Sequence, residues 1–594
     1  MQPARSWSSP SALSALLLLA CTLPAGAASA GISFADPVFA AMQAELGRAS
    51  SGLQFEGAAR PYRIACTVLD ASIVEVRAQA GAIVGADQDQ RRVIDVDVRV
   101  GGYDFDNSNF DSYGGGFGHG ESAIPIEDDP AALQRAIWLI TDEAYKDALR
   151  SMSSKEAFLR NRPKAAVEDL LADYTRISPV VVVQPTRALD ADLKEVEALV
   201  RDLARLLRDN PDLTHTGVVI TAGLVRRRHL DTEGSRADTT ETSVRLVASA
   251  SAMADDGTTL IDAVDFVAPS MATLPPRADL EAAVKALAAR VAALRVAPVM
   301  EDYDGPVLFE GAAAAQVMRH FLASNLSGTP APVSSAASGG GGEPTFARKM
   351  NRPVMPKGWS VVDDPALTEE AGIALLGHYK IDHEGVEPRR VELIKDGRLV
   401  AQLASRIPSK HQKASDGHGR APLQSRIVGH PGNLVIQSPQ GSAPAALGKA
   451  LLKLANDEGY DKALIVRRLA DDALFVTGAH LGSPMASMGD FPRPTWAVMV
   501  DAKGQETLVR GASLSHVILR NLRDIAAASR EPVVFNYLSS GVESGASYHS
   551  ASGDPLRAVP TSIVTPAFIL PHVEVGPDKG EARNPPLVPR PERR

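Results

Sequence analysis

A short apolar strand that leads directly into an alanine-rich helix, at Gly305–Leu322, constrains this chain most. Val307–Phe309 is wholly apolar, as at the end of a buried strand. Ala312–Ala315 is strong helix-forming sequence, and Val317 and Phe321 lie four residues apart on one side of the expected helix. The segment therefore predicts a strand-to-helix corner, and the side chains at that corner decide what chemistry the chain can support.

Length and composition indicate a large globular protein. The 594 residues suffice for about two to four domains. Hydrophobic residues make up 45% of the chain and charged residues 22%, which is ordinary for a protein with a full core. The formal net charge is -9. Because nonspecific nucleic-acid binding depends on a basic surface, we expect no nucleic-acid partner.

The N-terminus has the features of a secretory signal. Arg5 precedes the apolar stretch Ala12–Ala20, and Ala28-Ser29-Ala30 fits a cleavage site of small residues. Residues 1–30 are therefore predicted to be removed, and the mature protein to be exported: periplasmic, in the cell envelope or secreted. A short membrane anchor or lipid attachment at Cys21 are the alternatives. No later stretch has about 18 unbroken apolar residues, so no transmembrane segment is expected in the mature chain.

Cysteine is scarce, since only Cys21 and Cys66 occur. Removal of the signal would leave Cys66 alone, without a partner for an intrachain disulfide. Cys66 lies in a strand-like stretch, which favours a small buried residue over a nucleophile.

The first half of the chain mixes helix and strand patterns. Asp129 followed by Pro130 is a strong helix start, and the helix is expected to continue toward Arg160. Val93–Val100 alternates apolar and polar residues, as a strand with one wet face does. The other expected helices cover 36–50, 189–208 and 280–294, and the other expected strands cover 63–69, 73–78, 217–224, 228–230, 242–250 and 260–267.

The second half is dominated by strand and hairpin patterns. Asp396-Gly397 centres a hairpin between two apolar runs. Helices are expected at 445–455 and at 514–527, the latter because Val517, Ile518 and Leu522 are apolar at helical spacing. Residues 327–350 are rich in Ser, Gly and Pro, which is typical of a linker or an insertion.

The expected fold class is α+β, with an α/β N-terminal half followed by a β-rich C-terminal half. The predicted organisation is a signal peptide at 1–30, an α/β region at 35–300, the strand-helix segment at 301–326, the linker at 327–350, a β-rich domain at 351–575 and a disordered tail at 576–594.

Several stretches of this sequence resemble the TldD/PmbA family. They occur in the same order along most of the mature chain, about residues 35–575, although no single one is as specific as a metal-ligand signature. These stretches are Val93–Phe110 (VIDVDVRVGGYDFDNSNF), Asp231–Arg236 (DTEGSR), Gly305–Ala315 (GPVLFEGAAAA), Gly377–Gly385 (GHYKIDHEG), Ser405–Arg420 (SRIPSKHQKASDGHGR) and Val509–Ser515 (VRGASLS).

The resemblance implies a two-part fold and a zinc metallopeptidase site in the catalytic members, which digest small or unfolded peptides. Those members carry His-Glu-x-x-x-His on a helix and a Cys further along. Here Glu310 occupies the general-base position, whereas Phe309 and Ala314 occupy the two histidine positions. No Cys follows Cys66. Carbon side chains cannot bind zinc, so no metal and no cofactor are expected at this position.

Four other histidines could serve a displaced metal site. His378 and His383 are five residues apart, a spacing that places them on opposite faces of a strand unless a turn intervenes. His411 and His418 flank a Ser-Asp-Gly loop, where solvated side chains are expected. These histidines therefore remain alternatives to the expectation of no metal.

Three hypotheses follow for the function. The first is an exported, non-catalytic family member that binds peptides or acts as a partner subunit, because every expected zinc ligand is replaced. The resemblance implies that its partner would be a TldD-like subunit or a second copy of the chain. The second is an active metallopeptidase that binds zinc at a displaced site with Glu310. The third is a structural protein of the cell envelope that keeps only the fold.

Overall fold

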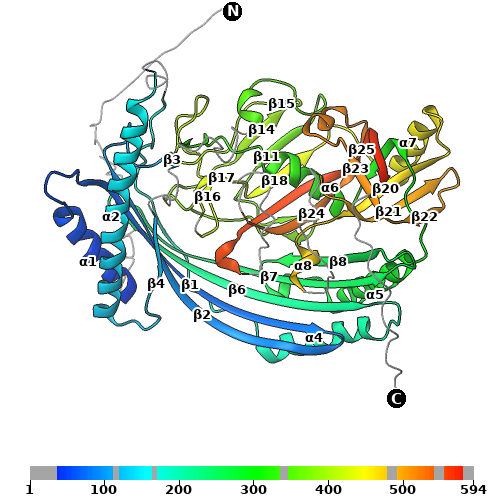
Figure 1. Cartoon of the computed structure of the whole chain (residues 1–594), viewed down its shortest axis with the longest axis horizontal. Coiled ribbons are helices and arrows are strands. Elements are labelled where there is room, and N and C mark those ends of the chain that lie inside the picture. Colours follow the sequence, from blue (N-terminus) through cyan, green and yellow to red (C-terminus); the bar gives the residue numbers. More distant parts are fainter. Residues whose placement is uncertain are drawn as a thin grey trace, which may run out of the picture.

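The computed structural model describes residues 36–111, 119–163, 170–334, 345–423, 425–477, 491–540 and 554–578. The chain forms two large sheets that face one another, with helices on the outside of the N-terminal sheet (Figure 1). The predicted signal peptide with Cys21, the centre of the predicted linker and most of the predicted tail lie outside the described residues.

The N-terminal sheet is built from four long antiparallel strands that curve around the C-terminal half (Figure 1). The strand order is β4-β2-β1-β6-β7-β5, and β8 also pairs with β7. The bounds are β1 Pro61–Gln79, β2 Ala82–Val100, β4 His119–Ala123, β5 Val181–Val183, β6 His215–Asp231, β7 Arg236–Met253 and β8 Thr259–Ala268.

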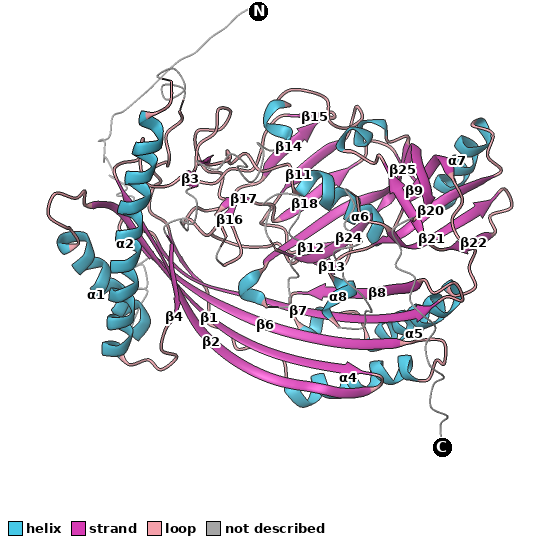
Figure 2. Ribbon diagram, in the orientation of Figure 1, coloured by secondary structure: helices cyan, strands magenta, loops and turns pink. Residues whose placement is uncertain are grey.

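Alternation along these strands gives the sheet one face for helices and one face for the C-terminal half. At one end, Ile64, Cys66 and Val68 of β1 pack with the helices α1 (Pro37–Gly52) and α2 (Pro130–Arg160). At the other end, the sheet is covered by α4 (Leu193–Arg208) and α5 (Arg277–Leu294) (Figure 2). The N-termini of α1, α2 and α4 are capped by the side chains of Asp36, Asp129 and Asp192, respectively, which accept hydrogen bonds from backbone N–H groups.

The C-terminal sheet is centred on β9 (Tyr303–Phe309), which lies between β25 (Val559–Pro577) and β20 (Lys462–Leu469). The helix α6 (Ala312–Met318) follows β9 and continues as a π-helical turn, Arg319–Ala323. The other elements of this half include β11 Ser360–Asp363, β14 Val391–Lys395, β15 Arg398–Leu399, β18 Asn433–Gln437, α7 Pro444–Asp457, α8 Ala473–Val476, β21 Pro494–Asp501, β22 Glu506–Val509, β23 Ala512–Ser515 and β24 Ala527–Ser539. Shorter strands complete it: β12 Glu369–Glu370, β13 Ile373–Ala374, β16 Gly419–Arg420, β17 Val428–Gly429 and β19 Gly441–Ser442, while β10 Val333–Ser334 pairs with β3 Phe110–Asp111 of the N-terminal half.

The predicted α+β fold class is confirmed, with an α/β N-terminal half and a β-rich C-terminal half. Cys66 is wholly buried, as predicted, and burial raises the pKa of its thiol. The predicted helix at 514–527 is wrong. Its apolar residues belong to the end of β23, a 3₁₀ turn at Leu519–Asp524 and the start of β24, and Ile518 is exposed. Among the described helices, none is long and apolar enough to cross a membrane.

Candidate functional site

The strand-to-helix corner predicted from the sequence is present between β9 and α6. Phe309 ends β9 and is fully buried, and its ring stacks on Phe568 of β25 with centroids 5.6 Å apart. On the other side, Phe309 is opposite Val466 of β20 in the parallel ladder. Neighbouring strands thus enclose the side chain at the first of the two histidine positions in a purely apolar environment.

Glu310 and Gly311 form the turn between the strand and the helix. The Glu310 N–H donates to the Val466 carbonyl at 3.0 Å, which extends the ladder by one bond. Gly311 has a φ of +57°, a conformation that residues with a Cβ rarely adopt. The helix α6 therefore starts only at Ala312, so Phe309 and Ala314 do not share one helical stretch.

The Glu310 carboxylate is bound by an arginine. Arg467 donates from Nε to Glu310 Oε1 at 2.7 Å and uses both of its terminal nitrogens on Glu506 of β22, also at 2.7 Å. The guanidinium of Arg467 lowers the pKa of Glu506. Glu310 is thus one end of an ion-pair network on the surface of the sheet, and its described partner is a cation rather than an imidazole.

The side chains at this corner do not fit a zinc ion. Ala314 is fully buried in the same apolar cluster as Phe309, and its methyl group offers no lone pair. Of the expected zinc-binding set, only the general-base position, Glu310, carries a polar side chain. No chemical step through a metal can be assigned to these residues.

In the described residues, Glu310 bonds to Arg467 and to none of the four alternative histidines. His378 is partly buried, and its Nδ1 bonds to the Pro365 carbonyl at 2.7 Å, whereas His411 is exposed. Within the described ranges, no group of three or more His, Cys, Asp or Glu side chains is arranged to hold a metal ion.

The sequence predicted that His411 and His418 both have solvated side chains, and for His418 this prediction is wrong. Its ring is fully buried between two carboxylates, with Nδ1 2.9 Å from Asp416 Oδ1 and Nε2 3.0 Å from Asp363 Oδ1. Burial alone would lower the pKa of His418, but the hydrogen bonds to Asp363 and Asp416 raise it to about 10. The imidazolium therefore joins two distant segments of the C-terminal half.

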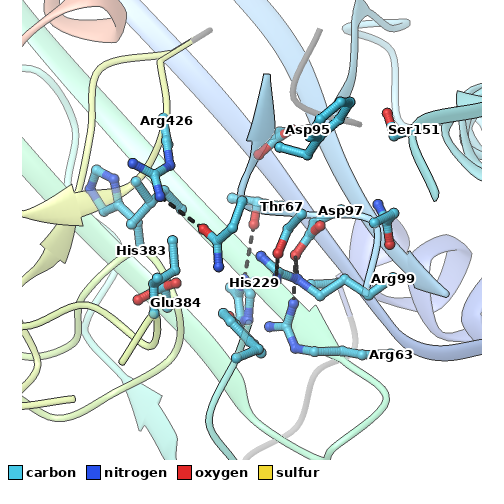
Figure 3. Close-up of a pocket in the computed structure, with 18 residues that line it drawn as sticks. Arg63, Thr67, Asp95, Asp97, Arg99, Ser151, His229, His383, Glu384 and Arg426 are labelled. Carbon is cyan, nitrogen blue, oxygen red and sulfur yellow. Dashed lines mark hydrogen bonds and ion pairs between the residues drawn. The ribbon is translucent and has the colours of Figure 1, made fainter. Parts of the chain in front are cut away.

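His383 contributes to a polar pocket of about 50 Å³ between the two halves. In Figure 3, His383 and Glu384 lie on one side of the pocket, opposite Thr67 and Asp97 on the strands of the N-terminal sheet. The lining is mostly polar and includes Arg63, Thr67, Asp95, Asp97, Arg99, Asn107, Ser108, Asn109, Ser151, Tyr174, His229, His383, Glu384 and Arg426.

Burial shifts the pKa values of the titratable groups in the loop at 382–384, which lines this pocket through His383 and Glu384. Burial, and then the positive charges of Arg227 and Arg420, hold the pKa of His383 well below its usual value, so the imidazole is neutral. Burial and the neighbouring Glu384 raise the pKa of Asp382 to about 7. Burial also raises the pKa of Glu384.

An ion-pair network beside the pocket joins the two halves. Arg406 binds both oxygens of Glu233, at 2.7 and 2.8 Å, and Arg63 binds Glu233 Oε2 at 2.8 Å. The guanidinium groups of Arg63, Arg99 and Arg406 lie over the ring of Tyr174, at 5.3, 3.6 and 4.1 Å. The quoted stretches Asp231–Arg236 and Ser405–Arg420 contain Glu233 and Arg406, but nothing in the sequence pairs two residues so far apart.

Comparisons with known proteins agree with this architecture. Residues 303–577 match the family model described as PmbA/TldA metallopeptidase C-terminal domain. TldE from Thermococcus kodakarensis is 13% identical with a TM-score of 0.55, over 90% of this chain and 100% of that chain. A protein from Thermotoga maritima described as a modulator of a DNA gyrase is 14% identical with a TM-score of 0.54, over 86% and 96%. A comparison with curated protein sequences gives no significant match.

A third solved structure, of a Bacteroides thetaiotaomicron protein described as a modulator of DNA gyrase, is 11% identical with a TM-score of 0.53, over 91% of this chain and 98% of that chain. At these identities the structural matches establish the fold. Together with the family match, they define a two-part α+β protein of the metallopeptidase-related class. The predicted resemblance to the TldD/PmbA family is therefore confirmed, by the family match over residues 303–577 and by the shared fold of the three solved structures.

The packing at the corner predicts the effect of changing Phe309. Phe309→Ala should lower the free energy of unfolding by about 3–5 kcal/mol, because it leaves a cavity among fully buried neighbours. Phe309→His should also destabilise the protein, since the imidazole would lack a hydrogen-bond partner there. Denaturant unfolding of both variants measures this. Ile518→Ala is the control: Ile518 is 55% exposed and should change stability by less than about 0.5 kcal/mol. A Phe309→His variant as stable as the wild type would contradict the apolar interpretation.

The carboxylates around His418 predict a pH-dependent stability. A folded pKa of about 10 lies above the unfolded pKa of roughly 6.5, so the stabilisation is complete below pH ~6.5 and is lost as the pH rises toward about 10. His418→Phe should cost about 3–5 kcal/mol at pH 6.5, because it leaves two buried carboxylates without their cation. The difference from the wild type should shrink steadily up to pH 10 in thermal unfolding. His411→Gln, on the exposed part of the same loop, should change nothing. A pH-independent difference would refute the assignment.

Proposed function

We propose that the protein is an exported, non-catalytic TldD/PmbA homologue that binds peptides or acts as a partner subunit. One observation carries this proposal: the two histidine positions of the family motif are filled by Phe309 and Ala314, both fully buried in the apolar core. A hydrolytic zinc site needs imidazole or similar ligands and an open position for water. The side chains at this corner supply neither.

The state of Glu310 supports the same conclusion. A general base must lie within reach of the water proton that it removes. The Glu310 carboxylate instead accepts a hydrogen bond from Arg467, which also holds Glu506. This pairing gives Glu310 a structural role in tying the corner to β20 and β22, a role that needs no metal.

Peptide binding remains feasible without metal chemistry, because an extended peptide can add to a sheet through backbone groups alone. Among the described strands, β22 ends the path of the C-terminal sheet and pairs only with β21. Its free edge lies next to the Glu310–Arg467–Glu506 network, at the corner where the resemblance places the peptidase site. This edge is the place where we propose that an extended segment binds.

Metal content and peptidase activity test the non-catalytic assignment. The purified mature protein should retain substoichiometric zinc, because no ligand set is present at the corner. It should show no chelator-sensitive cleavage of an unfolded-peptide library, and Glu310→Gln should match the wild type in every readout. One zinc per chain after gel filtration, with chelator-sensitive cleavage lost in Glu310→Gln, would instead establish the displaced-site metallopeptidase.

Co-purification and cell fractionation test the remaining parts of the proposal. The full-length protein should be found outside the cytoplasm and should co-purify with a TldD-like subunit or bind unfolded peptides in the presence of chelator. Deletion of residues 1–30 should retain it in the cytoplasm, and Cys21→Ser serves as the control for lipid attachment. Co-purification with a wall or membrane complex alone, without peptide binding, would favour a structural envelope protein.

A further inference from the structure

Unpartnered nitrogen atoms concentrate where the two halves meet. In the described part of the chain, six buried side-chain nitrogen or oxygen atoms lack a hydrogen-bond partner. Three of them lie at this boundary between the two halves, here called the seam. They are Arg227 Nε, His229 Nε2 and His383 Nε2. Buried polar atoms are nearly always hydrogen-bonded, and each exception requires an explanation such as a bound group. Three exceptions in one place point to something that the protein binds there.

The three side chains come from facing surfaces. Arg227 and His229 are two residues apart on β6 and therefore project from the same face of the N-terminal sheet. His383 belongs to the opposing loop of the C-terminal half. That loop reaches His229, because a Cβ placed on Gly385 would lie 3.5 Å from His229 Nε2. His229 and His383 both line the polar pocket.

Two of the three atoms are hydrogen-bond donors, and the surroundings of the third, His229 Nε2, favour a proton on it. The Ala421 N–H donates to His383 Nδ1 at 3.2 Å, so the neutral imidazole carries its proton on Nε2. His229 Nδ1 lies 2.9 Å from the Thr67 hydroxyl, and its Nε2 lies 3.7 Å from Asp231 Oδ2, which is too far for a hydrogen bond but favours a proton on that nitrogen. An arginine Nε always donates. The missing partner is therefore an acceptor.

The charge at Arg227 specifies this acceptor further. Its guanidinium makes no hydrogen bond or ion pair with any residue that the structure describes. On the opposite face of β6, Arg226 and Arg228 are both paired with aspartates. The carboxylates of Glu241, Asp95 and Asp382 act on Arg227 only from a distance, whereas burial and the second cation Arg420 oppose its charge. A partly buried cation that no carboxylate contacts favours an anionic ligand.

We propose that the seam between the two halves binds the carboxylate group of a small ligand, received by Arg227, His229 and His383. A carboxylate presents two acceptor oxygens and one negative charge, which matches one unpaired guanidinium flanked by two imidazoles. His229 and His383 line the pocket of about 50 Å³, which has room for a group of that size, and Arg227 lies two residues from His229 on the same face of β6. Asp95, Asp97 and Glu384 also line the pocket, which disfavours a doubly charged phosphate.

The carboxylate has two sources, a free small acid or the C-terminus of a peptide, and the binding chemistry is the same for both. The site uses none of the residues at Phe309–Ala314. If no carboxylate binds at the seam, the non-catalytic assignment is therefore unaffected. Conversely, metal-dependent cleavage at the corner would not contradict carboxylate binding at the seam.

Ligand-dependent thermal shifts of the full mature protein test the proposal. Sodium acetate should raise the unfolding temperature above that in sodium chloride of equal ionic strength. If the carboxylate belongs to a peptide C-terminus, an acetylated dipeptide with a free carboxyl end should also raise the unfolding temperature. Its amidated counterpart should not. Sodium phosphate should be weaker than acetate. No carboxylate-specific shift, or a larger shift with phosphate, would overturn the proposal.

Arg227→Met separates a ligand-binding role from a structural one. Removing an unpaired, partly buried charge should leave the unfolding temperature of the ligand-free protein unchanged or raised. The apparent affinity for the carboxylate should fall by about tenfold or more, as for a lost charge-assisted hydrogen bond. Arg77→Gln, an exposed arginine of the same sheet, is the matched control and should retain the shift. A lower unfolding temperature with an intact carboxylate response would assign Arg227 to structure alone.

Discussion

The ion pair between Arg406 and Glu233 is the contact on which the arrangement of the two halves depends. Arg406 is fully buried, and such a pair stabilises a structure only when further hydrogen bonds offset the loss of hydration. Here the Thr175 carbonyl accepts from Arg406 and the Tyr103 hydroxyl donates to Glu233. Because these bonds are directional, they fix the position of the C-terminal half on the N-terminal sheet far more narrowly than an apolar layer would. The polar pocket exists because the seam is built in this way.

The seam and the strand-to-helix corner have opposite chemistry. Between Phe309 and Ala314, the side chains that face the core are apolar, and the one polar residue, Glu310, accepts a hydrogen bond from an arginine. At the seam, the facing side chains are arginines, carboxylates and histidines, three of which keep an unpartnered nitrogen. The seam is therefore better suited to binding a ligand than the corner is to hydrolysis. The two sites lie on different elements and can be altered separately.

The sequence patterns predicted the helices and the strand-helix corner well, because these depend on local spacing. The long strands were predicted in pieces, since β1 and β6 carry charged residues such as Asp70 and Arg226 that look like interruptions. In the structure these residues pair across the sheet, Asp70 with Arg228 and Arg226 with Asp238. The helix expected at 514–527 is wrong because the two ends of this stretch belong to β23 and β24, which both pair with β25, and a 3₁₀ turn at Leu519–Asp524 lies between them. His418 and Arg406 were missed for a different reason: their partners Asp363 and Glu233 are 55 and 173 residues away, and no spacing rule reaches that far.

The corner can persist without catalysis because the fold requires its shape. Phe309 is the last residue of a strand enclosed by β20 and β25, so any side chain there must either be apolar or have a partner within the core. A histidine at this point satisfies that requirement only while a ligand occupies its nitrogen. A phenylalanine that stacks on Phe568 satisfies it at all times. An apolar side chain at this position therefore favours stability over metal binding. The turn at Gly311 and the pairing of Glu310 with Arg467 then hold the corner in place by packing and electrostatics alone.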